Sequence, residues 1–129
     1  MVAAQRPIEL IQARGLIASL STAAFLVDEV GNLLFYNEAA GELLGLRFEE
    51  AGEMAPEEWG GRFRPRKPGG AELAVEELPL TIALREGQPG HARMEITGAD
   101  GEDRQIAVSA IPIRGQYGQH GAFAIFWPA

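Results

Sequence analysis

Few residues that perform chemistry occur here at spacings that a reaction would need. The chain has no cysteine and two histidines, His91 and His120. Thiol catalysis, disulfides and cysteine-ligated zinc are therefore excluded. No serine, histidine and aspartate combine at a spacing that suggests a catalytic triad. We expect no catalytic residues, no metal site and no enzymatic activity.

The remaining polar motifs are typical of solvated surface. Paired acids occur where helix surfaces or helix N-termini are expected, at Glu49/Glu50, Glu57/Glu58 and Glu76/Glu77. The glycines Gly115, Gly118 and Gly121 do not form a dinucleotide fingerprint, because no helix follows to present its N-terminus to a phosphate. A basic cluster at Arg62, Arg64, Arg66 and Lys67 lies among prolines and glycines. We interpret this cluster as a solvated loop, with contact to an anion or an acidic partner as the alternative.

Length and charge limit the class of protein. The chain has 129 residues, the size of one domain, and a formal net charge of -7. Because a negative surface repels phosphate backbones and anionic lipid, we expect no nucleic-acid partner and no membrane association. No apolar run approaches the roughly 20 residues of a membrane span, and the N-terminus lacks the apolar run of a signal peptide. These observations predict a cytoplasmic protein.

The N-terminal part predicts an amphipathic helix over residues 8–20. Pro7 is suited to the start of a helix, where its missing N–H costs nothing. The apolar stripe of this helix consists of Leu10, Ala13, Ile17 and Leu20, with polar residues between them.

Two short strands and a helix are expected next. Residues 24–27 and 33–36 are apolar runs around a turn that contains Gly31. Both faces of each strand are apolar, so we expect both faces of the sheet to be covered. Asn37 is suited to cap a helix over 38–44, which Gly45 then ends.

The second half predicts one more clear helix and three strands. The helix covers residues 76–86 and ends at Gly87. The strands cover 92–97, 104–113 and 122–127, with a hairpin turn at Asp100-Gly101 and a glycine-rich loop over 115–121. Helices grouped between runs of strands favour an α+β fold, with an antiparallel sheet and helices packed on one face.

The order of these motifs resembles PAS domains. The first half contains Phe25-Leu26-Val27-Asp28, Gly31, Leu34 to Ala40 and Leu43-Leu44-Gly45, and the second half contains Glu77 to Leu80, Asp100-Gly101 and Val108 to Ile113. The resemblance covers about residues 20–127. It implies a five-stranded antiparallel sheet with short helices on one face, and the N-terminal amphipathic helix on or near the other. It also implies a bacterial sensory module without an effector, since the chain ends at Ala129. We divide it into an N-terminal dimerisation cap (residues 1–21) and a PAS domain (22–129).

The resemblance places a cavity between the sheet and the helices. The side chains expected to line it are Leu26, Phe35, Leu80, Ala83, Leu84, Met94, Ile96, Val108, Ala110, Phe123 and Ile125. This space is either a filled core or, if slightly underfilled, an apolar pocket for a ligand. The opposite face should pair with a second copy to form a homodimer. Its expected interface residues are Leu10, Ala13, Ile17, Leu20, Phe25 and Val27.

The identity of a cofactor stays open. PAS relatives hold haem, flavin, other chromophores, small metabolites or nothing. Cysteine-linked chromophores are excluded, and haem is disfavoured because the helix over 76–86 has no histidine. Non-covalent flavin, stacked for example on Trp59, and a small metabolite remain open. Met54 and Met94 are potential soft ligands, with filling of the core as the simpler interpretation.

The leading hypothesis is a signal-transduction sensor that binds a small ligand and passes a population shift to its outer helix or to a partner. The alternative is a ligand-free module for dimerisation or for docking onto a separate effector, such as a kinase, a cyclase or a transcription factor. A small α+β enzyme is the third reading, and the inward positions offer no buried carboxylate for it.

Overall fold

A computed structural model describes residues 7–115 and 118–129. Five strands form one sheet in the order β2-β1-β5-β4-β3, and every neighbouring pair is antiparallel. The strands are β1 (Ala23–Asp28), β2 (Leu33–Tyr36), β3 (Gly90–Thr97), β4 (Asp103–Gly115) and β5 (Gly118–Pro128). The predicted α+β fold with a five-stranded antiparallel sheet is confirmed.

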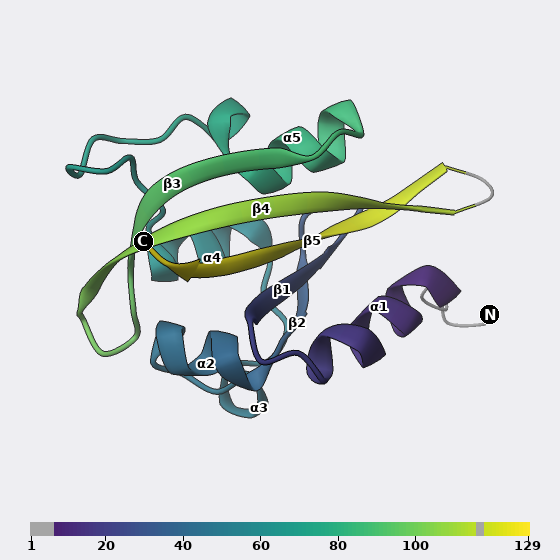
Figure 1. Ribbon diagram of the computed structural model, residues 1–129, viewed down its shortest axis with the longest axis horizontal. Helices are drawn as coiled ribbons and strands as arrows, with labels where there is room; N and C mark the ends of the chain where they lie inside the picture. Colours follow the sequence, from purple (N-terminus) through teal and green to yellow (C-terminus); the bar gives the residue numbers. More distant parts are fainter. Residues whose placement is uncertain (1–6, 116–117) are drawn as a thin grey trace.

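Helices cover the two faces of the sheet unequally (Figure 1). The helices on one side, with a short 3-10 turn, are α2 (Glu38–Leu44), α3 (Phe48–Ala51), α4 (Pro56–Phe63), η1 (Val75–Glu77) and α5 (Pro79–Glu86). The N-terminal helix α1 (Ile8–Ala18) packs against β1, β2, β4 and β5 on the other side. Within the described part of the chain, no helix is long and apolar enough to cross a bilayer.

Hydrogen bonds to a polar side chain stabilise the turn between β1 and β2. The Asp28 carboxylate accepts hydrogen bonds from the backbone N–H groups of Val30 (3.1 Å) and Asn32 (2.9 Å). Gly31 adopts a φ of 91°, which glycine reaches without a steric cost. These features reverse the chain in four residues and place Gly31 beside α4.

Asn37 connects three elements from a buried position. Its Oδ1 accepts hydrogen bonds from the backbone N–H groups of Ala24 in β1 and Ala40 in α2, both at 3.0 Å. Its Nδ2 donates to the carbonyl oxygens of Ile17 (2.9 Å) and Thr22 (2.8 Å). The predicted cap of α2 is confirmed, and the same amide also fixes the end of α1 to the sheet.

Apolar side chains form two clusters, one on each face of the sheet. The larger lies under the helices and contains Phe25, Val27, Met94, Val108 and Phe126 among others. The smaller lies under α1 and contains Leu10, Ile17, Ala24, Leu26, Leu34 and Ile113. Alternate residues of β1 therefore belong to different clusters, as the pleat of a strand requires.

Both edges of the sheet are partly covered. On the β2 edge, the backbone of Leu33 exchanges hydrogen bonds with Met54 (2.7 and 3.2 Å). On the β3 edge, Glu95 exchanges two hydrogen bonds of 2.8 Å with Arg66. Arg66 also pairs with Glu72, so the segment predicted as a solvated loop is folded against the sheet.

The predicted elements differ from the structure at some boundaries. The helix over 38–44 is confirmed, with Gly45 as its left-handed end. The helix predicted from residue 76 begins at Pro79, because Val75–Glu77 form a separate 3-10 turn. The predicted glycine-rich loop over 115–121 is wrong where described: Gly115 ends β4 and Gly118 begins β5, while 116–117 lie outside the described residues.

Candidate functional site

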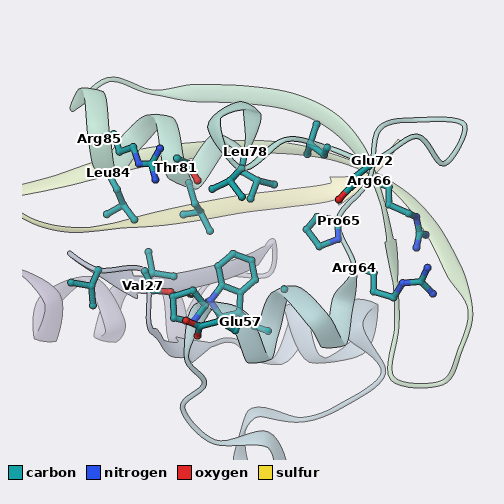
Figure 2. A pocket seen from close by; sticks show the side chains of 18 of the residues that line it. Val27, Glu57, Arg64, Pro65, Arg66, Glu72, Leu78, Thr81, Leu84 and Arg85 are labelled. Carbon is teal, nitrogen blue, oxygen red and sulfur yellow. Dashed lines mark hydrogen bonds between the residues drawn. The ribbon is translucent and has the colours of Figure 1, made fainter.

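An open cavity of about 800 Å³ lies between the β1–β2 turn, α4, α5 and the segment that joins α4 to α5 (Figure 2). This volume is within the range of sites that hold small ligands, roughly 300–1,000 Å³. Its apolar wall includes Val27, Trp59, Leu73, Leu78, Leu80 and Leu84. Its charged rim includes Glu29, Glu57, Arg64, Arg66, Glu72 and Arg85.

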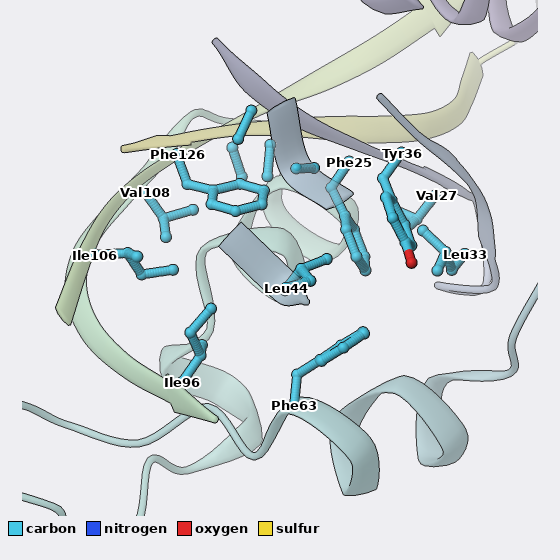
Figure 3. Close-up of a cluster of buried hydrophobic side chains, with 14 of the residues drawn as sticks. Phe25, Val27, Leu33, Tyr36, Leu44, Phe63, Ile96, Ile106, Val108 and Phe126 are labelled. Atoms are coloured by element: carbon cyan, nitrogen blue, oxygen red, sulfur yellow. The ribbon is translucent and has the colours of Figure 1, made fainter. Parts of the chain in front are cut away.

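A second, smaller pocket of about 80 Å³ lies deeper, against the sheet. Its lining is apolar and includes Phe25, Leu44, Phe63, Met94, Ile96, Ile106, Val108 and Phe126. Figure 3 shows most of these side chains converging from the sheet, α2 and α4. Trp59, Pro65, Leu78 and Leu80 line both spaces. The outer cavity and the inner pocket are therefore separated by shared side chains rather than by backbone.

Trp59 occupies the centre of this arrangement. Its indole N–H donates a hydrogen bond to the carbonyl oxygen of Gly31 (2.9 Å), which fixes α4 to the β1–β2 turn. Its ring meets Phe25 edge to face, with centroids 5.4 Å apart. Trp59 is thus an ordered wall of the cavity, which a planar or aliphatic ligand can contact.

The charged groups at the rim differ in how they are neutralised. The Arg66 guanidinium donates to Thr97 (2.9 Å) and lies 3.4 and 3.3 Å from the carboxylates of Glu95 and Asp103. Asp103 has a pKa below its ordinary value because Thr97 donates a hydrogen bond to it and because Arg66 and Arg64 are nearby. Both arginines therefore lie near carboxylates, whereas Arg85 makes no ion pair or hydrogen bond with any residue described.

The structure brings about half of the predicted pocket residues to these spaces. Leu80 and Leu84 line the cavity, and Leu80, Met94, Ile96 and Val108 line the inner pocket. Ala83 and Ala110 are fully buried in the same cluster without lining either space. Their role as ligand contacts stays a prediction.

Four predicted pocket residues face the other way, so their placement is wrong. They are Leu26, Phe35, Phe123 and Ile125, and all belong to the cluster under α1. Conversely, Phe25 and Val27, expected at a dimer interface, lie under the helices and line the pocket and the cavity. For β1 the physical reason is that Ala23 to Val27 are all apolar and buried, so its sequence carries no alternation that identifies the inner face. Phe35, Phe123 and Ile125 lie on β2 and β5 and are the partners of Leu26 and Ala24, so the same error in face carries over to them.

The predicted interface on α1 also needs correction. Leu10 and Ile17 are 2% and 1% exposed, because they pack on the sheet of their own chain. Ala13 is half-buried in the same cluster, and Leu20 is exposed beyond the end of the helix. Leu10 and Ile17 therefore cannot present their side chains to a second copy while α1 is docked.

Sequence reasoning found part of the polar rim, since Arg64 and Arg66 of the basic cluster line the cavity, but it missed the polar residues of α5. Thr81 and Arg85 were assigned no role, although they lie four residues apart on α5 and both line the cavity. The available signal was their spacing: Thr81 and Arg85 are four residues apart and so share one face of the helix, next to the stripe formed by Leu80 and Leu84.

Both histidines lie outside the cavity and the inner pocket. His91 is exposed on β3, with Nδ1 2.8 Å from the Ser109 hydroxyl oxygen. His120 is 3.5 Å from the Glu9 carboxylate beside α1. Among the described residues no group of three or more His, Cys, Asp or Glu could hold a metal ion. The cavity therefore offers no histidine to a haem, and Met94 is the soft donor of the inner pocket.

Comparisons with known proteins assign the fold. No protein-family model matches the sequence, and no curated protein matches it. Solved structures do match over nearly the whole chain. The PAS domain of a protein from Colwellia psychrerythraea is 20% identical, with a TM-score of 0.67, and the alignment covers 93% of this chain and 96% of that one.

Two further solved structures are also similar. The Rhodobacter sphaeroides LOV protein is 14% identical with a TM-score of 0.72, covering 95% of this chain and 68% of that one. The light-state dimer of the fungal blue-light photoreceptor Vivid is 15% identical with a TM-score of 0.60, covering 84% and 77%. The α+β sheet and its helices thus define a PAS-like architecture. This chain has the PAS fold.

Proposed function

We propose that this protein is a sensory module that binds a small ligand in the cavity between α4, α5 and the β1–β2 turn. The observation that carries the proposal is an open volume of about 800 Å³ over an apolar pocket, with Trp59 in the wall of both. Similar structures include a blue-light photoreceptor, which is a sensor with the same fold. Neither the cavity nor its rim presents a nucleophile paired with a base, so we propose binding without catalysis.

A bound ligand has a physical route to the rest of the sheet. Leu80, Thr81 and Leu84 place one face of α5 in the cavity. The C-terminal end of α5 is fixed to β5, because Gln119 Nε2 donates to the Ala83 carbonyl oxygen (2.6 Å). A ligand that shifts α5 would therefore also strain the β4–β5 hairpin, on which α1 packs. We propose that this shift in population is the signal.

The residues that line the cavity limit the chemical class of the ligand. A chromophore linked through cysteine is excluded, since the chain has none. Haem is disfavoured, because neither His91 nor His120 lines the cavity. A small metabolite or a non-covalent flavin against Trp59 fits the volume and the apolar wall.

A pair of glycines on α4 gives a direct test. Gly60 lines the cavity, Gly61 does not, and a Cβ added at either meets no atom within 4 Å. Gly60→Leu should fill the mouth of the cavity, while Gly61→Leu makes the same change one residue away. We expect metabolites that raise the Tm of the parent protein to raise that of Gly61→Leu equally and to leave Gly60→Leu unaffected. A panel without any shift in the parent, or equal shifts in both variants, would overturn the proposal.

A second candidate function is dimerisation or docking onto a separate effector such as a kinase, a cyclase or a transcription factor. The observation that favours it is the outer face of α1, where Ile8, Ile11 and Leu16 are 62%, 58% and 64% exposed. Large apolar side chains gathered on one helix mark interaction surfaces more often than scattered ones do. The division into a cap (residues 1–21) and a sensory domain (22–129) belongs to this proposal.

Light scattering tests the homodimer. The double variant Ile11→Glu/Leu16→Glu should halve the mass of a dimer, since it places charges on the exposed face without touching the buried one. Gln88→Glu is the control, because Gln88 is exposed and lies outside α1. A parent protein that is monomeric at high concentration, or a double variant with unchanged mass, would refute dimerisation through α1.

A further inference from the structure

At one end of the cavity, two polar side chains make no hydrogen bond or ion pair with any described residue. Thr81 and Arg85 lie four residues apart on α5, and Figure 2 shows both at the end of the cavity away from Arg64 and Arg66. Within residues 7–115 and 118–129, neither side chain makes a hydrogen bond or an ion pair. The exposed Arg85 guanidinium, at the mouth of the cavity, and the half-buried Thr81 hydroxyl thus lie beside the apolar wall with donors that no described residue uses.

Of the other two arginines of the rim, Arg66 is held by hydrogen bonds and ion pairs and Arg64 is not. Arg66 is held by Thr97, Glu95 and Asp103. Arg64 ends α4 in a left-handed conformation and lies close enough to Asp103 to lower the pKa of that carboxyl. Arg64, like Arg85, is exposed and makes no ion pair or hydrogen bond with a described residue, but Arg85 lies beside the Thr81 hydroxyl on α5 and is therefore the cation better placed to bind a ligand together with a second donor.

The apolar neighbours of Arg85 define the rest of the ligand. Leu80 and Leu84 precede Thr81 and Arg85 on α5, and Trp59 forms another part of the wall. A ligand whose charged end meets Arg85 must extend its body along these side chains toward the inner pocket. That body is favoured to be apolar, because the inner pocket is lined almost entirely by carbon.

We infer that the ligand is an amphipathic carboxylate, whose anionic head is bound by Arg85 and Thr81 and whose apolar body lies against Leu84 and Trp59. A carboxylate matches the paired donors of a guanidinium, and the adjacent hydroxyl supplies one further donor. The carboxylates of Glu29 and Glu57 come from the β1–β2 turn and α4 and would repel an anion placed there. This charge distribution orients the head toward α5. The inference rests on the proposed function and adds the chemical class of the ligand.

Trp59 can report on this binding directly. The chain has two tryptophans, and Trp127 is 43% exposed on β5. Trp127→Phe therefore leaves Trp59 as the single fluorophore with a small change at the surface. Suitable probes are straight-chain acids of about six to ten carbons with their amides and their amines, which do not absorb where tryptophan is excited.

The inference is tested by comparing the affinities of acids and of the corresponding amides. We expect each acid to bind about twofold to fivefold more tightly than its amide at neutral pH and low salt, as for an exposed ion pair. In the same background Arg85→Gln should abolish this preference while leaving the affinity for the amide unchanged. Arg62→Gln is the control, since Arg62 is exposed on α4 and does not line the cavity.

Three results would overturn the inference. Equal affinity for acid and amide would refute recognition of the anion, although binding that Gly60→Leu blocks would still support the proposed function. Tighter binding of the amine would assign the head group to the glutamate wall instead. A failure of every acid to bind would exclude this ligand class, and the Gly60→Leu comparison would then test the proposed function separately.

Discussion

Replacing Asn37 by alanine should detach α1 from the sheet and lower the stability of the whole domain. Five hydrogen bonds are lost, four of 2.8–3.0 Å and one of 3.4 Å to the Leu20 carbonyl oxygen. The N–H groups of Ala24 and Ala40 and the Thr22 carbonyl lose this partner, while the Ile17 carbonyl keeps the hydrogen bond from the Leu20 N–H. With about 1 kcal/mol for each net hydrogen bond, the expected loss is about 3–5 kcal/mol. That is a large fraction of the 5–15 kcal/mol that typically stabilises a domain.

The two halves of this loss can be separated with Asn37→Ser. A serine hydroxyl can still cap α2 by accepting from Ala40, but it is too short to replace the amide that reaches the carbonyls of α1. We expect serine to recover about 1 kcal/mol relative to alanine, the usual contribution of an N-cap. Both variants should lose protection of the α1 amides against hydrogen exchange, while the β4 amides are affected only through global stability.

Urea denaturation followed by circular dichroism measures the total effect, and hydrogen exchange measures its location. A loss of less than about 1 kcal/mol in Asn37→Ala, or α1 amides that stay as protected as in the parent, would refute the role given to this side chain.

Three further predictions follow from individual contacts. The pKa of Asp100 is lowered to about 2, mainly by the hydrogen bond from Arg104. The free energy of unfolding should therefore decrease as the pH drops from 4 to 2. Asp100→Asn should flatten this dependence in an acid titration of the free energy of unfolding. Burial raises the pKa of Tyr36 to about 12, and its hydroxyl donates to the Leu46 carbonyl oxygen (2.5 Å). The parent protein should therefore lose stability as the pH rises from 10 to 12. Tyr36→Phe should lower the free energy of unfolding by about 1 kcal/mol at neutral pH and remove the loss of stability between pH 10 and 12. Leu10→Ala should cost about 2–4 kcal/mol in urea denaturation, because Leu10 is 2% exposed under the sheet; an effect below 1 kcal/mol would mean that α1 is not docked in solution.

The fold was predictable because several local signals agreed with one topology. Asn37 followed by a short apolar helix and Gly45 predicted α2 to the residue, since a cap and a left-handed end are local properties. In β4 the alternation of Ile106, Val108 and Ala110 with less buried residues predicted the inner face correctly. Signals of this kind do not depend on distant parts of the chain.

The inner face of β1 was not predictable in the same way. Five consecutive residues of β1 are buried, so a shift by one residue leaves the apolar pattern unchanged. The choice between Leu26 and Phe25 is made by the partners: Phe25 lies opposite Tyr36 and Ala124, which also belong to the larger cluster. Because pairing across strands is non-local, the pattern of one strand could not reveal it.

The cavity itself was only half predictable. Its apolar wall on α5 follows from helical spacing, which predicted Leu80 and Leu84. The segment from Arg64 to Glu72 has no periodic pattern, and it reaches the cavity because Arg66 pairs with the edge of β3 at Glu95. The partly empty volume depends on how well distant side chains fill the space, and a sequence does not specify that filling.

A nitrogen–proton NMR titration of the protein with the most tightly bound compound tests the central claim most directly. The account predicts that the largest shift changes occur at the Trp59 indole N–H, in α4 and α5, and in the β1–β2 turn around Gly31. Shift changes concentrated on the outer face of α1, or an indole resonance that does not move at saturation, would contradict a ligand site in the cavity.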